Sequence, residues 1–134
     1  MERGVRKAFW HLGLKYVPLF HITVDKRSDK PPQIKLPKKF LKDDIVFIVD
    51  DVISTGKTMD IALQEILKRG EPTIIVIVLI VSPLIYDLFI KYPSIRVVCI
   101  DFDPLVDEKG FLVPGLGDND KMIFGALEEN RLER

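Results

Sequence analysis

The stretch IVFIVDDVISTGKT, from Ile45 to Thr58, decides the fold of this chain. Its first five residues are apolar and rich in β-branched side chains, which is typical of a strand covered on both faces. Its last residues open a helix predicted from Lys57 to Arg69, with its apolar positions on one face and Gly70 as C-terminal cap. The stretch therefore predicts a buried strand, a short polar loop and a helix in direct succession.

Strands and helices alternate along the rest of the chain. The other predicted elements are a helix over Val5–Tyr16, a strand over Pro18–Val24, a strand over Ile74–Val81, a helix from Ser82-Pro83 to about Lys91, and a strand over Ile95–Ile100. Solidly apolar strands that alternate with helices predict an α/β fold, with a parallel, Rossmann-like sheet and helices on both of its faces.

One long polar segment interrupts this alternation, from Asp25 to Phe40. It carries three prolines and overlaps a cluster of seven basic residues between Asp25 and Lys42. Such a cluster is either a solvated loop or a surface that faces a polyphosphate. We predict a flexible flap over about residues 25–40, within a single domain that spans residues 1–134.

Composition excludes several classes of partner. The 20 basic and 20 acidic residues give a net charge of zero, so no overall charge favours nucleic acid or an anionic membrane. The longest apolar run, Ile74 to Val81, is too short to span a bilayer. The single cysteine, Cys99, lies in an apolar run and is predicted to be a buried strand thiol. One cysteine cannot form a disulfide within the chain, which fits a reducing compartment and predicts a cytoplasmic location.

The loop that follows Val49 has the composition of an anion site. Ligands of parallel sheets bind beyond the carboxyl ends of the strands. At this end the predicted helix presents backbone N–H groups and the positive end of its dipole, and Gly56 would let the backbone approach an anion closely. Polar side chains are dense around it: Ser54, Thr55, Lys57 and Thr58.

Two carboxylates, Asp50 and Asp51, stand directly before this loop. They would repel a phosphate unless they bind vicinal hydroxyls or a divalent cation, and a ribose phosphate offers the hydroxyls beside its phosphate. Two other interpretations remain. Gly56-Lys57-Thr58 matches the end of a nucleotide-binding P-loop, although Asp51 occupies the position of that motif's first glycine. An ordinary turn between strand and helix is the other.

Two motifs carry a resemblance to a known family. The apolar strand, the two acids and Ser54-Thr55-Gly56 resemble the ribose-phosphate loop of the type I phosphoribosyltransferases. The more specific motif is FLVPGLGD from Phe111 to Asp118, followed by Ile123-Phe124-Gly125, which is similar to the C-terminal signature of uracil phosphoribosyltransferases. The resemblance extends from about Arg3 to Gly125.

This resemblance implies a role for particular residues. Asp50 and Asp51 would bind the ribose hydroxyls, and both, together with Asp118, are the implied catalytic residues. The implied ribose 5-phosphate site consists of Asp50, Asp51, Val52, Ile53, Ser54, Thr55, Gly56, Lys57 and Thr58. Uracil would meet Leu112, Gly117, Asp118 and Asn119, and pyrophosphate would meet Arg3, Lys26 and Arg27. No residue is implied as a direct metal ligand; Mg²⁺ would arrive bound to phosphoribosyl pyrophosphate.

The implied activity is transfer of a phosphoribosyl group from phosphoribosyl pyrophosphate to uracil, which gives UMP and pyrophosphate in pyrimidine salvage. The implied partners are these small molecules and further copies of the chain, with neither nucleic acid nor membrane. A non-catalytic module that binds phosphoribosyl pyrophosphate or nucleotides, and a P-loop nucleotidase, are the alternatives.

Four departures from the family pattern affect these expectations. The family usually has proline at the position of Asp51, a small residue at that of Lys57, and Ala-Gly-Asp with a following basic residue in place of Asn119-Asp120-Lys121-Met122. Family members also have a further N-terminal portion, with a core strand and a pyrophosphate loop, of which Arg3-Gly4 would be the remnant. We therefore expect a sheet that lacks its N-terminal elements and exposes two edges, and weak or absent activity for the isolated 134-residue chain.

Overall fold

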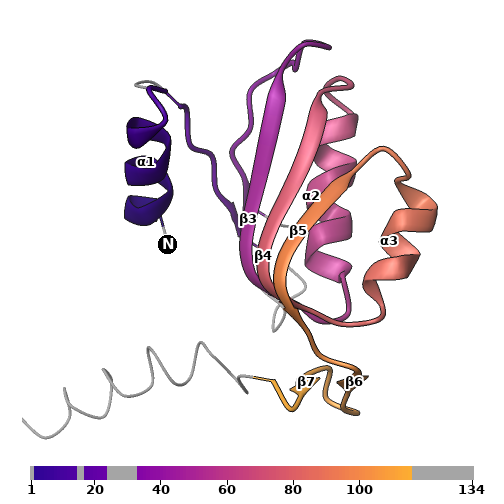
Figure 1. Ribbon diagram of the computed structural model, residues 1–134. Coiled ribbons are helices and arrows are strands. Elements are labelled where there is room, and N and C mark those ends of the chain that lie inside the picture. Colours follow the sequence, from indigo (N-terminus) through magenta and orange to yellow (C-terminus); the bar gives the residue numbers. More distant parts are fainter. Residues whose placement is uncertain (1, 15–16, 24–32, 116–134) are drawn as a thin grey trace, which may run out of the picture. The chain divides into compact units, whose positions relative to one another are not determined.

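The computed structural model describes residues 2–14, 17–23 and 33–115, and it separates the chain into two units, Met1–Lys38 and Lys39–Arg134. The first unit holds a helix and a pair of very short strands, and the second holds a parallel sheet with two helices (Figure 1).

The first unit begins with helix α1 (Glu2–His11). This helix ends earlier than predicted because Gly13 adopts a φ of +80°, a left-handed conformation that ends helices. Strand β1 (Ile22–Thr23) pairs antiparallel with β2 (Gln33–Ile34), so only the end of the strand predicted from Pro18 to Val24 is observed. Residues 25–32 of the predicted flap lie outside the described residues.

The second unit contains the predicted parallel sheet. Strands β3 (Ile45–Ile53), β4 (Thr73–Val81) and β5 (Arg96–Phe102) lie in the order β3-β4-β5, with helix α2 (Lys57–Leu67) between the first two and α3 (Ile85–Lys91) between the last two (Figure 1). The α/β fold with a parallel sheet is therefore confirmed. Every strand and helix predicted from residue 45 to residue 102 is present, with ends that differ by a few residues.

The core of this unit lies on the side of the sheet that carries both helices. Leu63 of α2 has no exposed surface, and Val76 of β4 is 1% exposed. The buried apolar residues of α2, β4 and α3 include Met59, Ala62, Leu63, Ile66, Ile74, Val76, Val78, Ile85 and Leu88. The helical face predicted for residues 57–69 is thus the face that α2 buries.

The opposite face of the sheet is largely exposed and apolar. Its exposed side chains are Ile45 and Phe47 of β3, Ile77 and Leu79 of β4, and Val98, Ile100 and Phe102 of β5. The prediction of helices on both faces is wrong for the described part of this unit. The strands β3, β4 and β5 lie side by side in the order of the sequence. Connections between parallel strands are almost always right-handed, so both connecting helices, α2 and α3, lie on the same side of the sheet.

Strand β5 forms an edge of this three-stranded sheet, and its residues are less covered than predicted. Cys99 is exposed, so the prediction of a buried strand thiol is wrong. Its apolar neighbours in the sequence indicated a covered strand, but an edge strand has a partner on one side only. β3 forms the other edge of the sheet among the described residues.

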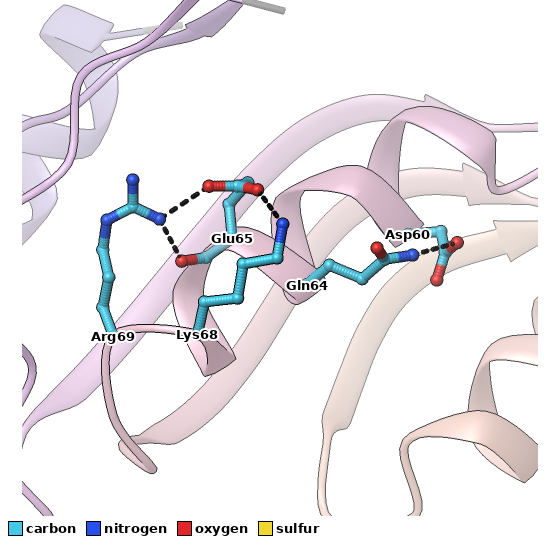
Figure 2. A network of polar contacts seen from close by, with 5 residues as sticks. All are labelled: Asp60, Gln64, Glu65, Lys68 and Arg69. Atoms are coloured by element: carbon cyan, nitrogen blue, oxygen red, sulfur yellow. Dashed lines mark hydrogen bonds and ion pairs between the residues drawn. The ribbon is translucent and has the colours of Figure 1, made fainter.

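The outer face of α2 carries a polar network (Figure 2). Glu65 accepts from Lys68 at 2.5 Å and from Arg69 at 2.7 Å, while Gln64 donates to Asp60 at 2.9 Å. Hydrogen bonds from Lys68 and then Arg69 lower the pKa of Glu65. The network keeps this face of the helix solvated and leaves the apolar face for the sheet.

Asp60 also connects the two helices of this unit. It accepts from Lys91 Nζ at 2.7 Å and from the Tyr92 hydroxyl at 2.6 Å, at the C-terminal end of α3. Burial acts to raise the pKa of Asp60, but the hydrogen bonds from Lys91 and Tyr92 outweigh it, and the pKa is lowered. These contacts fix the C-terminal end of α3 to the first turn of α2.

Among the residues described, no helix has both the length and the apolar character needed to cross a membrane.

Candidate functional site

The two acids predicted to bind ribose lie inside a strand. β3 continues past Val49, where the sequence placed its end, to Ile53, so Asp50 and Asp51 are its sixth and seventh residues. Asp50 pairs with Val78, a buried residue on the helix-covered face, and successive strand residues point to opposite faces. Asp51 donates its backbone N–H to Asp50 Oδ1 at 2.9 Å. The two carboxylates therefore stand on opposite sides of the strand near its carboxyl end.

Helix α2 starts directly beyond this strand. Gly56 is its N-cap residue, with a φ of +72°, and the first helical bond runs from Asp60 N–H to Gly56 O at 2.8 Å. Among the described residues no side chain caps this end of α2. Lys57 is exposed and Thr58 is half-buried in the first turn. An uncapped helix N-terminus favours anion binding, and the use of this one as a phosphate cradle stays a prediction.

Gly56 has a packing role that the sequence did not indicate. A β-carbon at this position would lie 3.2 Å from Leu88 Cδ1 of α3, and the left-handed φ disfavours any other residue. The need for glycine here follows from the turn and from contact with α3. Close approach to a phosphate, the reason given by the sequence, stays a prediction.

Ser82, at the end of β4, fixes the loop between β3 and α2. It is fully buried, its N–H donates to Ile53 O at 3.0 Å, and its hydroxyl donates to Ser54 O at 2.5 Å. The Ser82 hydroxyl oxygen accepts from Leu84 N–H at 3.1 Å. Helix α3 begins only at Ile85, with Leu84 as its N-cap residue, so it starts later than the predicted start at Ser82-Pro83. The position of Ser54 is therefore set by the neighbouring strand.

Ser54 in turn holds the second predicted motif. Its hydroxyl donates to Gly110 O, which joins residues 56 positions apart in the sequence. Gly110 belongs to the turn between strands β6 (Leu105–Val106) and β7 (Leu112–Val113), an antiparallel pair. The predicted phosphate loop is thus in direct contact with the turn that immediately precedes the predicted base motif, Phe111 to Asp118.

The base motif begins at β7. Leu112 is 6% exposed, so its side chain belongs to the core and a base could meet only its backbone. The Val113–Pro114 peptide bond is cis. The next residue, Gly115, donates its N–H to Asp103 Oδ2 at 3.0 Å, and Asp103 is itself buried just past the end of β5. The motif is therefore held against the carboxyl end of the sheet.

The structure places the predicted site residues unequally. Asp50 to Thr58 and Leu112 all lie in the second unit, at or near the carboxyl end of the sheet. Arg3 lies in α1 of the first unit. The predicted residues Lys26, Arg27, Gly117, Asp118 and Asn119 lie outside the described residues.

Sequence reasoning missed Asp103 as a site residue, and it recognised Ser82 only as a helix start. The rule that ligands bind beyond the carboxyl ends of parallel strands indicates the loops after Val81 and Ile100, which contain both positions, but it does not single out these residues. Within the described ranges no group of three or more His, Cys, Asp or Glu side chains could hold a metal ion. Near the end of β3 the described chain offers two carboxylates, on opposite sides of the strand, which do not make an all-protein Mg²⁺ site.

Comparison with known proteins gives a consistent picture. The family model described as uracil phosphoribosyltransferase matches residues 1–126. The uracil phosphoribosyltransferase of Pyrobaculum islandicum is 38% identical over 87 residues, which cover 63% of this chain and 41% of that protein. The Dictyostelium discoideum uracil phosphoribosyltransferase is 32% identical over 133 residues, covering 94% of this chain and 59% of the relative.

A solved structure with the same fold is that of the AQ2163 protein from Aquifex aeolicus. It superposes with a TM-score of 0.69 at 26% sequence identity, over 87% of this chain and 57% of the other. The chain spans about half the length of the curated relatives it matches.

Proposed function

The chain belongs to the uracil phosphoribosyltransferase family, and on this basis we propose that it binds phosphoribosyl pyrophosphate and transfers the phosphoribosyl group to uracil. The products are UMP and pyrophosphate. The proposed ribose 5-phosphate site is the stretch Asp50–Thr58, and the proposed base site begins at Leu112.

The single observation that carries this proposal is the order of groups at the end of β3. A pair of carboxylates, Asp50 and Asp51, is followed within five residues by Gly56 at the start of α2, where no described side chain caps the helix. Carboxylates accept hydrogen bonds from ribose hydroxyls, and a helix N-terminus binds the phosphate. A ribose 5-phosphate satisfies both, whereas an isolated phosphate would be repelled by the acids.

In the proposed reaction the bond from the anomeric carbon to pyrophosphate breaks with oxocarbenium character. A uracil nitrogen forms the new bond to that carbon and loses its proton to the departing pyrophosphate or to water. The protein needs no covalent nucleophile, because positioning and neutralisation of charge can supply the catalysis. The α2 N-terminus would hold the phosphate, and Asp50 and Asp51 would hold the ribose ring. Mg²⁺ bound to the pyrophosphate would neutralise the leaving group. Arg3, Lys26 and Arg27 are proposed to assist there.

Two alternatives lead to different measurements. A non-catalytic module would bind phosphoribosyl pyrophosphate but would not release pyrophosphate when uracil is added. A P-loop nucleotidase would bind nucleoside triphosphates through Lys57, yet Asp51 stands where that motif needs a glycine. Uracil-dependent release of pyrophosphate and calorimetry with ATP separate the three.

Thr58 provides the sharpest test of the phosphate site. We expect Thr58→Val to weaken binding of ribose 5-phosphate by about tenfold, because it removes a hydroxyl donor from the first turn of α2 without changing side-chain volume. Titration calorimetry on the 134-residue chain measures the change.

Thr73→Val is the matched control, since Thr73 begins β4 at the opposite end of the sheet and is exposed. Its affinity for ribose 5-phosphate should equal that of the unaltered chain. Equal affinities for all three proteins would remove the α2 N-terminus from the site, and ATP binding that depends on Lys57 would favour the nucleotidase.

A further inference from the structure

Asp103 is a buried carboxylate to which the proposed reaction assigns no task. It is 7% exposed and directly follows β5. Its backbone N–H donates to Val81 O at 2.9 Å, which fixes Asp103 on the end of β4. Burying an acid is costly unless its oxygens are hydrogen-bonded. The hydrogen bond that the Asp103 carboxylate accepts therefore indicates why an acid is buried at this position.

That contact is with the base motif. Asp103 Oδ2 accepts the N–H of Gly115 at 3.0 Å, across twelve residues of sequence. Gly115 has a φ of +48°, and a β-carbon there would lie 2.1 Å from Leu112 O, so the chain folds back tightly on Leu112. Pairing with β6 holds Leu112 and Val113, and the bond to Gly115 fixes the other end of the turn. A hydrogen bond from an amide to a carboxylate is stronger than one between neutral groups.

Besides its pairing with β6, strand β7 has a hydrogen bond on each side that connects it to a different part of the protein. Gly110, before β7, accepts from the hydroxyl of Ser54, which belongs to the proposed phosphate loop. Gly115, after β7, donates to Asp103, which directly follows β5 at the end of the sheet. Loss of the Ser54 anchor would disturb both halves of the site. Loss of the Asp103 anchor would release only the half that carries the base motif.

We propose that Asp103 is a positioning residue for base recognition, which holds the turn Leu112–Gly115 where its backbone can meet the base. The role rests on the proposed function. Asp103 itself touches no substrate; it acts through Gly115. A backbone edge must be held in place to match the donors and acceptors of a small uncharged base, and a rigid anchor at one end of the turn serves that need.

The test compares two ligands that share the ribose phosphate and differ by the base, ribose 5-phosphate and UMP, on the full chain. We expect UMP to bind the unaltered chain more tightly. Asp103→Ala should lower UMP affinity by about tenfold or more, the loss of a hydrogen bond to a charged group, and change ribose 5-phosphate affinity by less than about twofold. Asp103→Asn keeps an acceptor oxygen for Gly115 N–H and should retain most of the UMP affinity.

Asp101→Ala is the matched control. Asp101 is an exposed acid in β5, two residues before Asp103. Within the described part of the chain, its carboxylate accepts only a local bond from Phe102 N–H. It should change neither affinity. Retained binding of ribose 5-phosphate shows that each variant is folded. Amide hydrogen exchange at Gly115 gives a second readout, and it should accelerate in Asp103→Ala and not in Asp103→Asn.

Three outcomes would overturn the role. The first is unchanged UMP affinity in Asp103→Ala. The second is a parallel loss of both ligands, which would make Asp103 a general stability residue. The third is an Asp103→Asn variant as weak as Asp103→Ala. If the unaltered chain binds neither ligand, the proposed function falls and the role of Asp103 falls with it, whereas a defect confined to the variants concerns Asp103 alone.

Discussion

Replacing both acids near the end of β3, in an Asp50→Asn, Asp51→Asn double variant, is expected to weaken ribose 5-phosphate binding by about a hundredfold. Binding of inorganic phosphate should not be weakened, because an isolated phosphate gains nothing from the acids and is repelled by them. The carboxylates are proposed to accept hydrogen bonds from the ribose hydroxyls, and amides accept such bonds less strongly because they are neutral. Calorimetry with the two ligands measures both affinities on the same preparation.

The structure supplies a matched control and a refinement. Asp43 and Asp44 are also adjacent acids, and they precede β3 at its amino end, so Asp43→Asn, Asp44→Asn removes the same charge without touching the site. Because Asp50 and Asp51 point to opposite sides of the strand, the two single variants should have unequal effects. Tighter ATP binding in the Asp50, Asp51 double variant would contradict the ribose assignment and favour a P-loop.

Self-association is the second large effect that we expect. One face of the sheet exposes apolar side chains from all three strands, and β3 and β5 are its edges among the described residues. Contiguous apolar faces and open strand edges promote association. The unaltered chain should therefore sediment as a dimer or larger species at micromolar concentration, and a Leu79→Lys, Ile100→Lys variant should sediment as a monomer.

The control variant changes residues of the same type and similar exposure on another part of the unit. Leu79 and Ile100 are 42% and 81% exposed, while Leu84 and Ile90, on the α3 side, are 40% and 81% exposed. Leu84→Lys, Ile90→Lys adds the same charge away from the open face and should leave the sedimenting mass unchanged. A monomeric unaltered chain, or equal effects of the two double variants, would show that the open face does not mediate association.

Much of the second unit could be predicted because its sequence is locally consistent. The apolar runs and the helical face of residues 57–69 each specify their own conformation. The local sequence does not indicate which face of the sheet the helices cover. The exposed face at Ile77 and Ile100 is as apolar as the covered one, so the composition of the strands could not show that both helices lie on one side.

The candidate site likewise has a part that could be predicted from the sequence and a part that could not. The helix start at Gly56 and the acids before it could be found from sequence, because an anion site of this kind is a local arrangement of strand, turn and helix. The bonds from Ser54 to Gly110 and from Gly115 to Asp103 join positions that no periodic pattern connects. Such bonds depend on the register of three strands, which fixes where the strands end relative to one another.

The bond between Ser54 and Gly110 also bears on the order in which the molecule folds. It closes a longer loop of chain than the pairing of β3 with β4 or of β4 with β5, and the entropy lost on closure grows with loop length. The sheet should consequently form first, and the two halves of the site should meet late, on the native side of the folding barrier. Substitution of Ser54 would then speed unfolding and leave the folding rate nearly unchanged, whereas truncation of Val76 in the central strand would slow folding.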